Sequence, residues 1–350
     1  MSDEFRFEQM NGTGAAGELP VAPAYSVLVQ LQANIGQRPI EIGRKGGCRY
    51  CGETNSSKFR NVAHAMPEGL GNKWIVSLDE CDACNAIFAA YDQALAVSVG
   101  PVLTVGGTQG KGNKVRQTGR SHGPNVISHS RLDGRRRLSL TTNADPGNAI
   151  AVDPSTRTIE LSAPVAIERF IPRHAYKALV KSGIALLPPD ELEKFSSLLA
   201  WLRDKDNSLD IPDMTVGLSF GSVGNAPPLV TAALVKRTSD DTRWPYMIFV
   251  MTVGSVCFQI ALKSDREDGQ WPPAGQAGSG LRWTNVIGGP QDADAIRIEY
   301  GAPNRLDWSS RSLELTPVEL LVTRINLATQ AAQIAPVLRK QDKSPVDDAS

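Results

Sequence analysis

Two pairs of cysteines constrain the fold of this chain more than any other feature of its sequence. Cys48 and Cys51 form one C-x-x-C pair, Cys81 and Cys84 form a second, and twenty-nine residues separate the two pairs. A two-residue spacer lets both sulfurs of a pair face one ion, and four thiolates satisfy tetrahedral zinc without leaving an open coordination position. The spacing therefore predicts a structural zinc ion (Zn²⁺), with local folding that depends on it.

The rest of the cysteine usage, and the opening of the chain, indicate a reducing environment. The fifth cysteine, Cys257, lies in an apolar stretch at 246–262, away from both pairs. Residues 1–22 are acidic, polar and glycine-rich, unlike a secretory signal peptide. We therefore expect a cytoplasmic protein without disulfides. Polar residues interrupt the 246–262 stretch, so we expect two core strands and no membrane partner.

Composition supports a folded chain and limits its electrostatics. The 350 residues are 41% hydrophobic and 21% charged, far from the composition of disordered proteins. That length favours two domains, or one large domain with an appendage. The formal net charge is +0, so binding to a polyanion must come from local clusters of Lys and Arg.

Changes in composition along the chain predict its organisation. We expect a cysteine-bearing module at 23–105, a basic linker at 106–137 and a mixed α+β domain at 138–338. Flexible tails are expected at 1–22 and 339–350. The overall class is predicted to be α+β.

Local patterns predict the elements of these regions. Residues 25–42 are expected to form a short helix or strand. Helical spacing predicts a hairpin of two helices at 172–187 and 192–202, and Thr316, Pro317 and Glu319 resemble the start of a helix over 316–338. Period-two and turn patterns predict strands at 138–140, 149–152, 158–161, 229–235, 247–253 and 256–262, the last three as a meander.

The residues between and after the cysteine pairs carry a more specific pattern. A histidine and a proline form a His-x-x-Pro turn, a Gly-Asn-Lys triplet follows, and the second pair runs directly into an asparagine. This order and spacing resembles the HNH endonucleases, in the branch whose C-x-x-C pairs bracket that turn. The resemblance covers roughly residues 48–101. It rests on His64, Pro67, Glu68, Gly71, Asn72, Lys73, Asn85, Phe88 and Asp92 together with the four cysteines.

The resemblance implies a ββα-metal (His-Me finger) fold around a catalytic divalent ion, Mg²⁺ or Mn²⁺. It makes His64 the general base on a water that attacks a DNA phosphodiester, a task that suits imidazole because its pKa lies near working pH. Asn85 matches the position that binds the metal or orients its ligands. Asp92, seven residues on, shares a helical face with Asn85 and is the second candidate ligand. Asn72 either orients the base or caps the turn after Gly71.

One position departs from the family. Most HNH enzymes carry Asp, Glu or His immediately before the base, and this chain has Ala63 there. Three alternatives follow. Asp92, Glu68 or Asp82 supplies the missing oxygen, His64 itself binds the ion, or the module no longer cuts.

The predicted linker is strongly basic. It contains a single acid, Asp133, and such a strip could track phosphates through salt-sensitive, sequence-independent contacts. A solvated linker is the alternative reading. The candidate nucleic-acid-binding residues are Lys111, Lys114, Arg116, Arg120, Arg135, Arg136 and Arg137.

Three functions remain open at this point. The first is a DNA endonuclease controlled by its C-terminal domain, by a homo-oligomer or by a protein partner. By analogy, an antiviral defence role beside a short Argonaute in a prokaryote would suit that layout. The second is a catalytically inactive zinc-knuckle adaptor that binds nucleic acid, and the third is a structural subunit. A second divalent site, distinct from the zinc, would separate the first from the second.

Overall fold

The computed structural model describes residues 6–8, 25–33, 38–119, 125–132, 135–142, 150–164, 168–211, 213–223, 230–242, 244–268, 285–287, 304–326, 328 and 332–338. The chain is mixed α+β, as its sequence predicts. None of the described helices is both long enough and apolar enough to cross a membrane. The predicted tail 339–350 lies outside the described residues. Within the predicted tail 1–22, strand β1 (Arg6–Glu8) pairs with β16 (Asn285–Ile287).

The largest sheet has six antiparallel strands. The predicted meander is confirmed, because β13, β14 and β15 are consecutive neighbours, and Gly254 takes the positive φ of 55° that the turn between β14 and β15 requires. The first half of 25–42 is a strand. In sheet order the strands are β17 (Asn304–Asp307), β11 (Thr215–Phe220), β15 (Val256–Leu262), β14 (Met247–Val253), β13 (Val230–Arg237) and β2 (Tyr25–Ala33).

A second sheet corrects the prediction for the C-terminal region. The expected helix over 316–338 is wrong, because this region forms β19 (Val318–Asn326) and β20 (Ala332–Leu338). Leu321 and Thr323 are buried while Arg324 is exposed, which is the period of a strand. The remaining strands of this sheet, in the order β12-β20-β19-β9-β8, are β12 (Ser222–Val223), β9 (Thr158–Pro164) and β8 (Ile150–Asp153).

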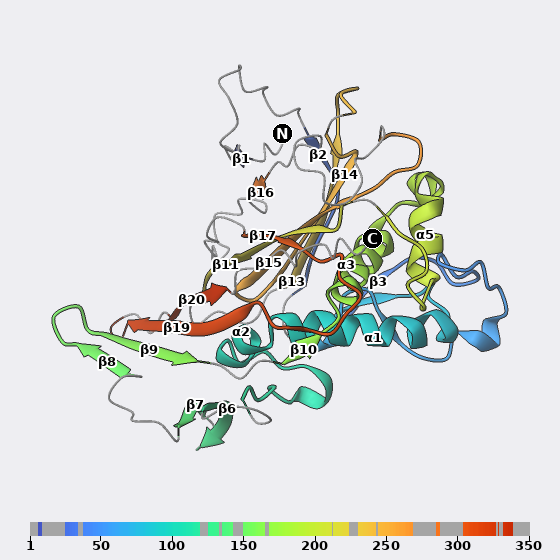
Figure 1. Ribbon diagram of the computed structural model, residues 1–350. Coiled ribbons are helices and arrows are strands. Elements are labelled where there is room, and N and C mark those ends of the chain that lie inside the picture. Colours follow the sequence, from blue (N-terminus) through green and yellow to red (C-terminus); the bar gives the residue numbers. More distant parts are fainter. Residues whose placement is uncertain are drawn as a thin grey trace, which may run out of the picture.

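Helix α3 (Pro172–Leu186) lies between the six-stranded sheet and helix α1 (Asp82–Ser98) (Figure 1). A Cβ on Gly183 would lie 2.9 Å from Leu262 Cδ1, so glycine permits this close approach to β15. The Tyr176 hydroxyl also donates to the Ala261 carbonyl of β15. The first predicted helix of the hairpin is thus confirmed. The second is broken into α4 (Pro189–Leu192), a 3₁₀ turn η5 (Glu193–Phe195) and α5 (Ser196–Arg203).

The region that bears the cysteine pairs, residues 38–105, is called here the cysteine module. Its small sheet places β5 (Ile75–Ser77) between the parallel β3 (Ile40–Ile42) and the antiparallel β4 (Ala63–His64), and α1 follows β5. Two 3₁₀ turns, η1 (Ser56–Lys58) and η2 (Glu68–Leu70), and helix α2 (Gly100–Val105) complete it. One continuous apolar core joins the module to the large sheet, including Phe88 of α1 and Phe249 of β14.

The basic region differs from the loop that its composition predicts. A 3₁₀ turn, η3 (Lys111–Asn113), precedes an antiparallel hairpin of β6 (Asn125–Leu132) and β7 (Arg135–Thr142). A lone bridge between Thr118 and Ile127 ties the hairpin to the preceding chain. The predicted strand at 138–140 belongs to β7. Elsewhere, β10 (Arg169–Phe170) pairs with β18 (Glu314–Leu315).

Candidate metal centre and neighbouring polar site

The four paired cysteines come together as their spacing predicts. Their sulfur atoms all lie within 4.8 Å of one another. The Cys48 and Cys84 sulfurs are 3.8 Å apart, and those of Cys51 and Cys81 are 3.6 Å apart. Four sulfurs at ~2.3 Å from one zinc ion in a tetrahedron would be about 3.8 Å apart. The cluster could therefore hold a metal such as zinc with little rearrangement.

The backbone around the first pair supports metal binding. The Gly52 amide donates to the Cys48 carbonyl at 2.8 Å, and its φ of 77° turns the chain back so that the Glu53 carbonyl accepts from the Cys48 amide at 2.8 Å. The Cys81 amide donates to the Cys48 sulfur at 3.4 Å. The hydrogen bond with the Cys84 thiol is the main cause that lowers the pKa of Cys48, and the Cys81 amide lowers it further. The same hydrogen bond raises the pKa of Cys84, and burial raises that of Cys51, so of these three thiols only Cys48 is shifted toward the thiolate that a metal requires.

His64, the predicted base, lies on β4 opposite Val76 of β5. Its Nε2 is 4.0 Å from Glu68 Oε2, and the two side chains are 24% and 28% exposed. Its Nδ1 is buried without a hydrogen-bond partner among the described residues. Burial lowers the pKa of His64 below its ordinary 6.5; Glu68 opposes this shift, and Lys181 reinforces it. At neutral pH the ring is therefore uncharged, with Nε2 as its accessible nitrogen.

The loop between β4 and β5 is packed closely against its surroundings. A Cβ on Gly69 would lie 2.9 Å from the Ala96 side chain of α1, so only glycine allows this approach. Gly71 has a φ of 99° and faces Thr108 in the same way. These contacts explain the glycine pattern of the sequence and fix η2, with Glu68, beside α1.

Asn72 is fully buried inside this loop. Its Nδ2 donates to the carbonyls of Met66 and Ile75 at 2.8 and 2.9 Å, and its Oδ1 accepts from the Trp74 and Ile75 amides. All of these partners are backbone groups of the loop or of Ile75, the first residue of β5. Asn72 thus holds the loop shape, and among its described contacts none is with the His64 ring.

Asp92, the predicted second metal ligand, lies in a buried polar cluster that sequence reasoning missed. Lys181 of α3 donates to the His64 backbone carbonyl at 2.5 Å and pairs with Asp92 at 3.3 Å. Glu80 lies 3.9 Å from the same ammonium group. Burial raises the pKa of Glu80 to about 7 and also raises that of Asp92, while Lys181 opposes both shifts. The Asp92 carboxylate is therefore engaged by a lysine behind β4.

Asn85, the other predicted ligand, lies in the first turn of α1. Its amide donates to the Cys81 carbonyl at 2.9 Å, and its partly exposed side chain makes no hydrogen bond to a described residue. The Asp82 carboxylate, in the same turn, accepts from the amides of Arg60 and Asn61 at 3.1 and 2.9 Å. This anchors the chain entering β4 to the start of α1. Apart from the four cysteines, no group of three or more His, Cys, Asp or Glu ligands gathers in the described parts of the chain.

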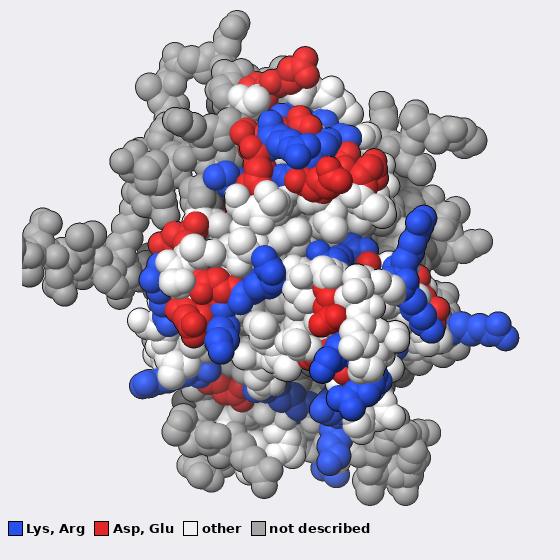
Figure 2. All heavy atoms as spheres, turned by 90° about the vertical axis from the view of Figure 1, so that its right-hand side faces the viewer, with Lys and Arg blue, Asp and Glu red and all other residues white. Residues whose placement is uncertain are grey.

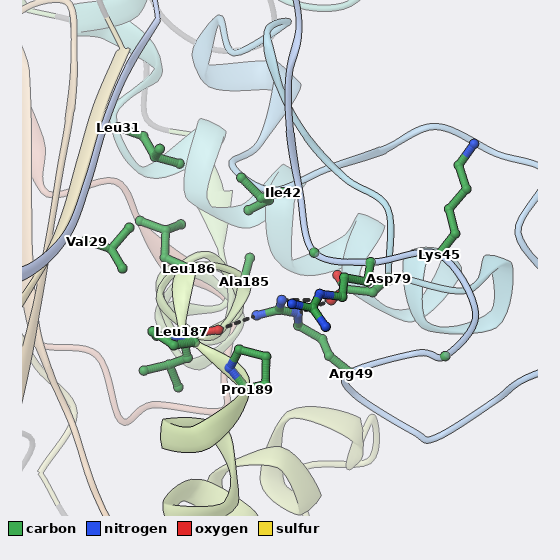
Figure 3. Close-up of a pocket in the computed structure, with 14 residues that line it drawn as sticks. Val29, Leu31, Ile42, Lys45, Arg49, Asp79, Ala185, Leu186, Leu187 and Pro189 are labelled. Carbon is green, nitrogen blue, oxygen red and sulfur yellow. Dashed lines mark hydrogen bonds and ion pairs between the residues drawn. The ribbon is translucent and has the colours of Figure 1, made fainter.

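Arg49 joins the first cysteine pair to the end of α3. Its guanidinium pairs with Asp79 at 2.7 Å and donates to the carbonyls of Ile184 and Leu187 at 2.7 and 3.1 Å. Figure 3 shows it between Asp79 and the helix end, in the wall of a cavity of about 420 Å³. Cationic groups suit a helix C-terminus, so Arg49 stabilises this junction.

The candidate phosphate-binding residues differ in exposure and in ion pairing. Lys111 and Lys114 are exposed, next to the loop of His64, because Gly110 packs on Gly69. Arg116 is instead paired with Glu168 at 2.5 Å, so its charge is already satisfied. Arg137 is exposed; Arg120, and the side chains of Arg135 and Arg136, lie outside what the structure describes.

Charges of both signs are mixed on the face in Figure 2, where neither Lys and Arg nor Asp and Glu dominate. This agrees with the net charge of +0 and leaves any attraction for nucleic acid to local groups.

Comparison with known proteins adds no relative. No family model, no curated protein and no solved structure matches this chain.

Proposed function

We propose that this protein is a metal-dependent HNH-type endonuclease that cleaves DNA, with His64 as its general base. The observation that carries the proposal is the position of His64. Its partly exposed imidazole, whose pKa is lowered by burial, lies on β4, and the chain entering β4 is bonded to the start of α1 beside a four-cysteine cluster.

The chemistry follows from the two ring nitrogens. Nδ1 is buried, so Nε2 is the atom that can take a proton from an attacking water. The Glu68 carboxylate, 4.0 Å from Nε2, would stabilise the imidazolium that results. A pKa below 6.5 keeps the ring ready to accept a proton at neutral pH.

Two oxygen-bearing side chains could hold Mg²⁺ or Mn²⁺. Asn85 is partly exposed at the start of α1, and Glu68 keeps a partly exposed carboxylate. Both offer the oxygen ligands that these ions prefer. Asp92 is less suited because Lys181 already pairs with it. When bound, the ion would stabilise negative charge on the phosphate and the leaving oxygen.

The cysteine cluster, two lysines and the large sheet would assist cleavage. A structural zinc at the four cysteines would hold the first and second pairs together. Lys111 and Lys114, exposed beside the His64 loop, would contact DNA phosphates. The large sheet, which shares its core with the cysteine module, would control cleavage by binding a protein partner or a second copy of the chain.

Plasmid cleavage with Mg²⁺ or Mn²⁺ tests the proposal. His64→Ala should abolish cleavage at unchanged zinc content. His174→Gln is the matched control, because His174 is also half-buried but its ring contacts Tyr91 and bonds Asn207. Equal cleavage by wild type and His64→Ala would refute the role of His64. DNA binding without cleavage under either ion would favour the catalytically inactive adaptor.

A further inference from the structure

Helix α3 carries two lysines that are buried among apolar residues, and one of them reaches the cysteine module. The Lys181 side chain is 1% exposed. Burying an ammonium group is costly unless it is paired and hydrogen-bonded. Lys181 meets that condition through its ion pair with Asp92, its bond to the His64 carbonyl and the nearby Glu80.

The contacts of Lys181 join four separate pieces of the module. Its ammonium reaches β4 at His64, α1 at Asp92 and the residue before the second cysteine pair, Glu80. Its own backbone carbonyl accepts a hydrogen bond from the Tyr50 hydroxyl at 3.0 Å, inside the first pair. No apolar side chain could replace the three contacts of the ammonium group, so packing alone does not explain a lysine here.

We propose that Lys181 is a positioning residue for His64, fixing strand β4 through the His64 backbone carbonyl. This inference rests on the function proposed for His64 above. β4 has only two residues and pairs with one neighbour, β5, so its own ladder holds it weakly. The bond from Lys181 gives β4 a second support, from the buried helix α3.

The same bond makes the His64 site depend on the large sheet. The opposite side of α3 is pressed onto β15 and β14, where a Cβ on Gly183 would lie 2.9 Å from Leu262 and 3.2 Å from Phe249. A shift of the sheet would therefore move α3, and α3 would move β4. Lys181 is thus a direct polar contact through which a movement of α3 would reach the strand that carries the base.

Lys181→Met and its matched control, Lys177→Met, test the proposal. Lys177 lies one turn earlier on α3 and is equally buried, but it packs on the rings of Tyr91 and Trp201 instead of binding β4. We expect Lys181→Met to lower kcat roughly 10- to 100-fold at unchanged KM and zinc content, since the misplaced base no longer aligns with the scissile phosphate. Lys177→Met should leave the kcat of the folded fraction unchanged.

The second readout is the NMR signal of the His64 imidazole in the zinc-loaded chain, assigned with His64→Ala. It should shift in Lys181→Met and stay in place in Lys177→Met. If Lys181→Met fails to fold because Asp92 is left unpaired, the double variant Lys181→Met/Asp92→Asn replaces it with the same expectation.

These measurements test the role of Lys181 separately from the proposed endonuclease activity. An unshifted His64 signal, or a kcat equal to wild type, overturns the role of Lys181. If wild-type protein cuts no DNA, the proposed endonuclease fails. The imidazole signal then decides alone: a shift supports the positioning contact, and no shift overturns it.

Discussion

Asn72 binds both backbone groups of Ile75: its Nδ2 donates to the Ile75 carbonyl at 2.9 Å, and its Oδ1 accepts from the Ile75 amide at 3.0 Å. The side chain is fully buried and also donates to the Met66 carbonyl. A single amide thus closes the loop that carries Glu68 between β4 and β5. Only a side chain with both donors and an acceptor can make this set of bonds.

Asn72→Ala should therefore lower the free energy of unfolding by about 2–4 kcal/mol, because several buried backbone groups lose their partner. Asn72→Asp should cost at least as much, since it removes both donors and places a carboxylate against two carbonyls. Urea unfolding measures the loss, with exposed Asn61→Ala as the control. A loss under 1 kcal/mol in Asn72→Ala would contradict this role.

Metal removal should unfold the cysteine module. We expect a single zinc ion per chain, lost in Cys84→Ser and retained in Cys257→Ser, because Cys257 lies on β15 far from the cluster. Elemental analysis gives the zinc content, and near-UV circular dichroism reports the packing around Tyr50 and Phe88, whose rings are 4.8 Å apart. Zinc retained by Cys84→Ser at the wild-type level would rule out this site.

Features set by neighbouring residues were predictable from the sequence. The cysteine cluster, α3 and the β13–β15 meander follow from spacing and periodicity over short windows. The residues before β19 resemble a helix N-terminus, because Thr316 suits an N-cap and Pro317 the first helical position. In the structure the Thr316 hydroxyl instead donates to the Ser98 carbonyl, and β9 and β20 supply partners for the strand. Tertiary pairing overrode the local signal.

Contacts between segments that are far apart in the sequence could not be predicted from local patterns. Lys181 and His64 are 117 positions apart, and nothing near either residue indicates the other. The sequence does contain one sign of buried lysines. Lys177 and Lys181 lie one turn apart on the apolar face of a predicted helix, where lysine is rarely found. The sequence pattern likewise predicts that Asp92 shares a helical face with Asn85 but gives no sign of its lysine partner.

The pH dependence of His64 has a definite sign. Its folded-state pKa lies below the ordinary 6.5, mainly through burial, with Glu68 opposing and Lys181 and Lys73 reinforcing. Between the folded and unfolded values the unfolded chain binds more protons, so His64 makes stability fall as pH drops below 6.5. In the pH profile of kcat/KM, the fall on the acidic side should likewise have its midpoint below pH 6.5. An NMR titration of His64 checks both, and a midpoint above 6.5 would contradict the burial argument.

Salt dependence of DNA binding separates free cations from paired ones in the basic region. Lys111 and Lys114 are exposed beside the His64 loop, whereas Arg116 is paired with Glu168 at 2.5 Å. Each phosphate contact that is lost should reduce the slope of log K against log salt by about 0.9 for duplex DNA. The double variant Lys111→Ala/Lys114→Ala should therefore weaken binding and flatten the slope by roughly two such steps.

Arg116→Gln should leave the slope close to that of wild type, because its guanidinium is held by Glu168. Binding measured by fluorescence anisotropy from low to moderate salt distinguishes these cases, and a larger change of slope in Arg116→Gln than in the double variant would show that the pair with Glu168 opens on DNA.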